Sequence, residues 1–225
     1  MSSRSLRIAP VLAILAAVTA SAGAGAATTR IPVVRCPTVF GVAGNHPRAP
    51  ATLAVDAAGP AHGLVAYTNT DLFLIAPRGL RCSGIVAADG GTQVVVWAAG
   101  ERKPQPHSRG IGLTLTVDPA CASCRADDAC PFFTTLARQA GFPCTAGIPA
   151  GERVRRPSRS VALFEDPPGV RDSGWPSGGP LPANGVVGTL PSSTEALVYR
   201  ATCTLPAADH AICTESLDDV IARYG

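Results

Sequence analysis

The sequence predicts a β-rich α+β domain, an antiparallel sheet or sandwich of short strands with two short helices and four disulfides. Glycine and proline account for 23 and 21 residues, and both interrupt regular structure, so the strands and helices should be short. The predicted strands come first and the strongest helix comes last, an order typical of helices packed on one side of an antiparallel sheet. Eight cysteines form an even set, enough for four bridges.

Residues 1–26 have the pattern of a signal peptide. Arg4 and Arg7 form a basic start, an apolar run follows, and small residues end in an A-x-A cleavage site. The alternative is a retained membrane anchor, because the uncharged run from Ile8 to Thr29 has enough residues to span a bilayer. Its second half consists of Ala, Gly, Ser and Thr, which gain little from hydrocarbon. We therefore expect cleavage and a secreted, extracellular protein without further membrane contact.

Residues 27–225 are predicted to form a single disulfide-stabilised domain, since a chain of this length can bury about 70% of its surface. The formal net charge of the whole sequence is only +3, and two basic residues lie in the signal peptide. Such a balance is not typical of nucleic-acid-binding proteins. We expect no nucleic-acid partner and no cofactor. The expected form is a monomer with an extracellular or cell-wall partner.

The first half of the mature chain is predicted to be mostly strands. The predicted strands are 30–35, 51–55, 63–67, 71–76, 93–98 and 111–117. Thr68-Asn69-Thr70 separates two of them and indicates a hairpin. The QVVVWA run at 93–98 is apolar on both faces, which predicts a position in the middle of a sheet. Residues 111–117 alternate Leu and Thr, as a half-buried strand does.

The second half contains the two predicted helices and a long loop. Further strands are predicted at 161–164, 186–190 and 196–205. The first helix, 131–140, begins at Pro131. The second, 209–224, has one apolar face formed by Cys213, Leu217, Val220, Ile221 and Tyr224. Residues 166–184 are rich in proline and glycine, and a loop of this length is usually functional or disordered.

The cysteines divide into two isolated pairs and one cluster. The isolated pairs are Cys36 with Cys82 and Cys203 with Cys213. We expect the first pair to bridge the first strand to the end of the early hairpin. We expect the second pair to bridge the last strand to the last helix.

The cluster contains Cys121, Cys124, Cys130 and Cys144. These four can pair in three ways, and the sequence leaves the choice open. A zinc site is the alternative, but the C-x2-C-x5-C-x13-C spacing lacks a second knuckle. A redox C-x-x-C motif at 121–124 would need a thioredoxin-like βαβ setting, which the pattern does not show. We expect structural bridges and no metal.

One segment suggests catalysis. Residues 177–181, S-G-G-P-L, resemble the surroundings of the nucleophile in trypsin-like serine proteases. His62 lies upstream, and Asp71 or Asp118 lies between them, in that family's order. The chain departs from the family at Trp175-Pro176, because a Gly-Asp pair is expected there and proline has no backbone N–H. Ser177 and His62 are the catalytic candidates of an alternative, a secreted hydrolase with its site at the 166–184 loop.

The leading hypothesis is a non-enzymatic extracellular interaction protein that presents the 166–184 loop. Its candidate binding residues are Arg171, Asp172 and Trp175. A basic run, Arg153 to Arg159, indicates an additional patch for anions.

Several local patterns also suggest a resemblance. They are Cys-Pro after the signal peptide, Ala76-Pro77 ahead of Cys82, C-x-x-C-x5-C-P-F-F, F-E-D-P-P-G at 164–169 and C-T-L-P at 203–206. The mature chain resembles an uncharacterised group of secreted, cysteine-stapled proteins of high-GC Gram-positive bacteria. No activity is assigned to that group, so the resemblance implies export and disulfides alone.

Overall fold

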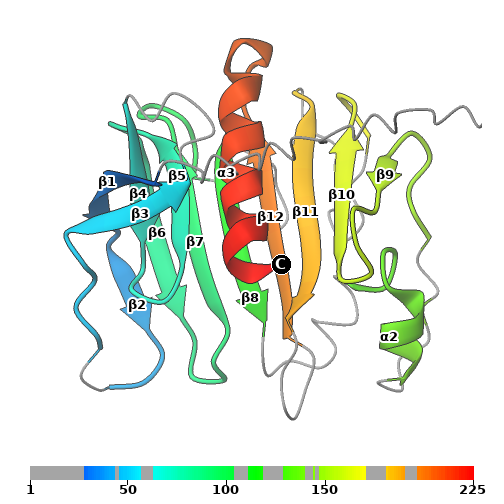
Figure 1. Cartoon of the computed structure of the whole chain (residues 1–225), viewed down its shortest axis with the longest axis horizontal. Helices are drawn as coiled ribbons and strands as arrows, with labels where there is room; N and C mark the ends of the chain where they lie inside the picture. The colour runs from blue at the N-terminus through cyan, green and yellow to red at the C-terminus, as the bar shows by residue number, and fades with distance from the viewer. Residues whose placement is uncertain are drawn as a thin grey trace, which may run out of the picture.

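The structure, a computed structural model, describes residues 28–43, 46–56, 63–103, 111–118, 129–139, 144, 147–170, 181–190 and 197–225. These residues form two β-sheets and a long C-terminal helix (Figure 1). The strands are β1 (Thr28–Arg35), β2 (Thr38–Phe40), β3 (Thr52–Asp56), β4 (Leu64–Thr68), β5 (Phe73–Pro77), β6 (Arg81–Val86), β7 (Thr92–Trp97), β8 (Gly112–Asp118), β9 (Arg153–Arg155), β10 (Val161–Asp166), β11 (Ala183–Leu190) and β12 (Leu197–Thr204). The helices are α2 (Thr134–Gln139) and α3 (His210–Tyr224), and a 3-10 turn (Ala207–Asp209) precedes α3.

Both sheets are mixed, which corrects the prediction of an antiparallel sheet. The small sheet has the order β3-β1-β4-β5, and the large sheet has the order β2-β6-β7-β8-β12-β11-β10-β9. Two pairs are parallel, β1 with β4 and β2 with β6. β4 and β6 belong to different sheets. β1 and β2 follow each other across Cys36-Pro37, and each pairs with one of them in a different sheet.

The strong strand signals are confirmed. The 93–98 run forms β7, which lies between β6 and β8, and Val94, Val95 and Val96 are all buried. The predicted hairpin is β4 and β5, paired antiparallel. The strand predicted at 111–117 is β8, and Leu113, Leu115 and Val117 point into the core.

Three strands were missed because their sequences carry weak β patterns. β2 and β9 have three residues each and lie at the two edges of the large sheet. β6, RCSGIV, contains Gly84 in its middle. A Cβ at Gly84 would lie 2.4 Å from the Cβ of Asn69, so close approach of the hairpin turn requires glycine there.

Asn69 holds the β4–β5 turn onto the large sheet. Its side chain is buried, and its Nδ2 donates to the Ile85 carbonyl at 3.0 Å and to the Thr92 hydroxyl at 2.7 Å. Its Oδ1 accepts from the backbone N–H of Asp71 and of Leu72. The amide therefore satisfies polar groups of both sheets at a buried junction, where unpaired groups would be costly.

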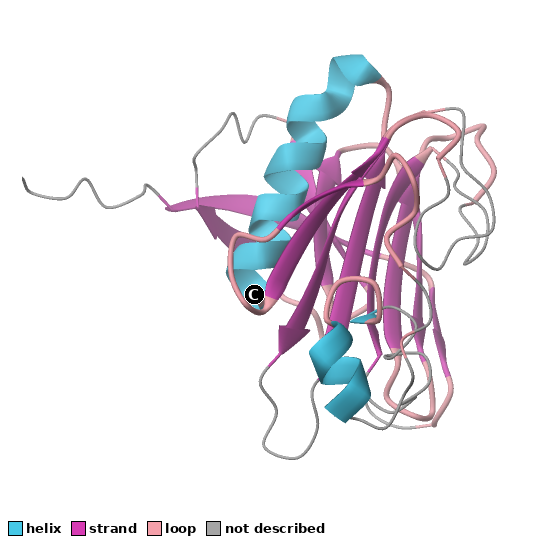
Figure 2. Cartoon of the chain, turned by 90° about the vertical axis from the view of Figure 1, so that its right-hand side faces the viewer, coloured by secondary structure: helices cyan, strands magenta, loops and turns pink. Residues whose placement is uncertain are grey.

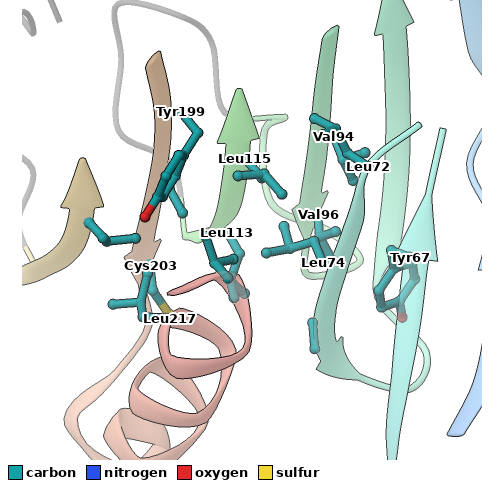
Figure 3. Packing of buried hydrophobic residues seen from close by; sticks show 14 of the residues in the cluster. Tyr67, Leu72, Leu74, Val94, Val96, Leu113, Leu115, Tyr199, Cys203 and Leu217 are labelled. Carbon is teal, nitrogen blue, oxygen red and sulfur yellow. The ribbon is translucent and has the colours of Figure 1, made fainter. Parts of the chain in front are cut away.

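The main core lies between the two sheets and α3 (Figure 3). The small sheet contributes Val65, Tyr67 and Leu74, and the large sheet contributes Val94, Val96, Leu113, Leu115 and Tyr199. A second cluster lies on the opposite face of the large sheet, where Phe132 packs on Phe164 with ring centroids 5.7 Å apart.

The predicted apolar face of the last helix is confirmed. In α3, Cys213, Leu217 and Val220 are buried, and Ile221 and Tyr224 pack against the same core. Figure 2 shows α3 lying along one face of the large sheet. The prediction did not include Ser216, which is buried on the same side and donates its hydroxyl to the Ile75 carbonyl of β5.

Three bridges join described cysteines. Cys36–Cys82 and Cys203–Cys213 are bonded as predicted, with Cα–Cα distances of 5.2 and 5.5 Å. Within the cluster, Cys130 is bonded to Cys144, which is one of the three pairings that the sequence left open. The other two cysteines of the cluster, Cys121 and Cys124, lie outside the described residues, so the predicted count of four bridges is tested for three.

The first predicted helix is much shorter than expected. Residues 131–140 were predicted to be helical, but α2 spans only Thr134–Gln139. The preceding residues form a turn in which the N–H of Phe132 and of Phe133 both bond to the Ala129 carbonyl. This turn directs Phe132 onto the sheet, so the helix begins at Thr134 and not at Pro131.

We expect Gly188→Ala to lower the free energy of unfolding by about 1–3 kcal/mol, because overpacking forces buried groups to move. A Cβ at Gly188 would lie 2.1 Å from Cζ of Tyr199, whose ring is fully buried. The control is Gly147→Ala, where a Cβ would have no neighbour within 4 Å. Denaturant unfolding measures both variants. Equal stability of the two would contradict this packing.

The tyrosines Tyr67 and Tyr199 should respond oppositely to replacement by phenylalanine. The Tyr199 hydroxyl is buried without a hydrogen-bond partner among the described residues, and burial raises the pKa of Tyr199 to about 12. The Tyr67 hydroxyl donates to the Pro77 carbonyl at 2.8 Å and accepts from the Leu80 N–H at 3.0 Å.

We therefore expect Tyr199→Phe to leave the free energy of unfolding unchanged or to raise it by about 1 kcal/mol, since it removes an unsatisfied group. We expect Tyr67→Phe to lower the free energy of unfolding by about 1–2 kcal/mol, because it leaves two partly buried backbone groups unpaired. Thermal unfolding of the two variants tests the pair. A loss in Tyr199→Phe as large as in Tyr67→Phe would show that the Tyr199 hydroxyl is hydrogen-bonded.

Candidate functional site

The described residues contain a surface groove between α3 and the edge of the large sheet. α3 packs on β5, β11 and β12, and the sheet continues past it through β10 to β9 (Figure 1). The groove encloses about 250 Å³. Its lining comes from β9, β10, the start of β11 and the first half of α3. Each wall is therefore part of a helix or strand.

A polar row crosses the floor at one end of the groove. The strand register places Arg153 opposite Glu165, and Glu165 opposite Asn184. An Arg153 guanidinium nitrogen lies 3.9 Å from a Glu165 carboxylate oxygen, a loose and exposed ion pair. Asn184 Nδ2 lies 3.2 Å from Nδ1 of His210, the first residue of α3. This contact ties the start of the helix to the sheet.

The next row is apolar. Arg155 lies opposite Leu163 in the strand register, and Leu163 lies opposite Val186. Leu217 of α3 closes the floor from the helix side. Leu163 is half-buried and Leu217 is 7% exposed, so the accessible aliphatic surface of the floor comes mainly from Leu163.

The two walls carry opposite charges. β9 contributes the exposed Arg153 and Arg155, and α3 contributes the exposed Asp218. Within the part of the chain that the structure describes, Arg155 and Asp218 form no ion pair or side-chain hydrogen bond. The groove can therefore interact with both signs of charge at once.

The groove adjoins the predicted functional loop. Its lining includes Glu165, at the end of β10, and Asn184, at the start of β11, and the 166–184 segment connects these strands. The candidate residues of that loop are Arg171, Asp172, Trp175 and Ser177. All four lie outside the described residues, as does His62.

The sequence analysis singled out the basic run from Arg153 to Arg159 as a patch for anions. The first residues of this run form β9, which is one wall of the groove, and Arg153 is already paired with the Glu165 carboxylate. His210 is exposed but bonded to Asn184. Asn184 and Asp218 were missed. No sequence signal brings them together, because register and helix placement do so.

The opposite face of the large sheet has a buried cation. Arg200 is 5% exposed, and its guanidinium carbon lies 5.0 Å from the centroid of the Phe164 ring. This arrangement is a cation–π contact. Phe164 in turn lies over Gly185, where a Cβ would come within 2.0 Å of the ring. These contacts stabilise the sheet beneath the groove.

The described residues contain no group of three or more His, Cys, Asp or Glu side chains placed to hold a metal ion. No helix in the described part of the chain is long and apolar enough to cross a membrane.

No protein-family model, curated protein or solved structure matches the chain. Its function must therefore be argued from the groove itself.

Proposed function

We propose that the protein is an exported, disulfide-stapled binding domain whose partner docks in the groove between α3 and β9–β10. The observation that carries this proposal is the composition of the groove. Exposed charged side chains flank an aliphatic floor, and all of these residues belong to a helix or a strand. Such a site loses little conformational entropy on binding, because its walls are already ordered. We propose a non-enzymatic role on this basis.

The bridges support an extracellular location. Cys36–Cys82, Cys130–Cys144 and Cys203–Cys213 are the kind of bonds that form and persist in an oxidising compartment. Export through a signal peptide at residues 1–26 fits this chemistry. The proposed partner is accordingly an extracellular or cell-wall component, and the proposed binding form is a monomer.

The 166–184 loop contributes to this proposal through its position in the chain. It leaves the sheet after Asp166 and returns at Ala183, and the neighbouring Glu165 and Asn184 line the groove. We propose that Arg171, Asp172 and Trp175 extend the binding surface from there.

The test is a binding assay with material from outside the cell. The protein, purified from culture medium with its bridges intact, is immobilised and exposed to isolated cell walls and culture supernatant. We expect retention of a partner by the native protein. We expect a loss of about tenfold or more in Arg153→Glu/Arg155→Glu, because reversing two charges on one wall places like charges against the partner.

The matched control is Arg78→Glu/Arg102→Glu, which makes the same change of charge at exposed positions outside the groove lining. Equal loss in both double variants would place binding outside the groove. A fluorophosphonate probe tests the alternative. Labelling of the native protein that disappears in Ser177→Ala would replace the binding domain with a secreted hydrolase.

A further inference from the structure

The size and openness of the groove limit what it can hold. Sites for drug-sized ligands enclose about 300–1,000 Å³ and cover most of the ligand. This groove encloses about 250 Å³, and six of its lining residues are exposed: Arg153, Arg155, Glu165, His210, Thr214 and Asp218. A free small molecule would remain largely in water. These dimensions favour one side chain of a larger partner, with its neighbours lying along the rim.

The floor selects the kind of side chain. Leu163 and Leu217 form its aliphatic part, between the two walls. An aliphatic side chain placed there leaves water without leaving a polar group of its own unpaired. Buried apolar anchors of this kind dominate the affinity of protein interfaces.

The charged residues of the two walls determine which partner residues can flank that side chain. On β9, Arg155 has no ion pair within the described residues, and Arg153 has only the 3.9 Å contact to Glu165. On α3, Asp218 has no ion pair among the described residues either. Arg155 and Asp218 line the same groove without bridging each other, so each remains open to a partner of opposite charge.

We propose that the groove binds a peptide segment in which an aliphatic residue lies between an acidic and a basic residue. The aliphatic side chain occupies the floor at Leu163 and Leu217. The acidic residue contacts Arg155, and the basic residue contacts Asp218. This inference rests on the proposed function, because it assigns the chemistry of the partner that the groove takes.

The test uses four capped peptides that differ only in charge, Gly-Glu-Leu-Lys-Gly, Gly-Glu-Leu-Glu-Gly, Gly-Lys-Leu-Lys-Gly and Gly-Gln-Leu-Gln-Gly, with free leucine as a small zwitterion. Binding to the intact protein is followed by the shifts of backbone amide resonances. We expect the Glu-Leu-Lys peptide to bind about tenfold or more tightly than the other three. The Glu-Leu-Glu and Lys-Leu-Lys peptides each place a like charge against one wall, and the Gln-Leu-Gln peptide has neither attractive charge. The shifts should centre on Leu163, Asn184 and Leu217.

A charge reversal sharpens the test. Asp218→Lys makes both walls basic, so its preference should change from Glu-Leu-Lys to Glu-Leu-Glu. The control Glu101→Lys makes the same change at an exposed residue outside the groove lining and should keep the native preference. Because the readout is a change of preference, it does not depend on the absolute affinity.

Three results would overturn the inference. They are equal binding of all four peptides, shifts centred away from the groove, and free leucine binding as tightly as the peptides. Each leaves the broader proposal separately testable. If cell-wall or supernatant binding still depends on Arg153 and Arg155, the groove remains the docking site and only the assigned peptide chemistry is wrong.

Discussion

The packing of α3 against both sheets is the interaction on which the rest of the structure depends. Its apolar face completes the core, and the Cys203–Cys213 bridge fixes its first half to β12. Ser216 bonds to the Ile75 carbonyl of β5, and the Tyr224 hydroxyl accepts the Phe73 N–H. One helix therefore makes covalent, polar and apolar contacts, and together these join two separate sheets.

This placement also creates the groove. α3 lies over β5, β11 and β12, and the strand order continues past it through β10 to β9. The charged residues of β9 then oppose Asp218 of the helix across aliphatic side chains. Because register and the Cys203–Cys213 bridge hold the walls, the spacing of these charges is a property of the fold. The binding proposal depends on that spacing.

The sequence predicted the elements that physical patterning marks clearly. β7 is a continuous apolar, β-branched run, and β8 and the α3 face have clear periodicity. Cys203–Cys213 followed from the position of its cysteines on the last strand and helix. Parallel pairing was missed because β1 joins the small sheet and β2 joins the large sheet. The local sequence pattern of a strand does not indicate which sheet it joins. β6 was missed because Gly84 serves the buried Asn69 turn. Asn184 and Asp218 of the groove are ordinary polar residues, and only the tertiary fold brings them to one site.

Native-state hydrogen exchange of the oxidised protein tests most directly whether α3 unites the two sheets. If it does, the slowest amides of α3, β5 and β12 should exchange with one common free energy, close to that of global unfolding. Exchange of α3 at a much lower free energy, while β5 and β12 stay protected, would contradict the account. The helix would then be a detachable cover, and the groove would have no fixed second wall.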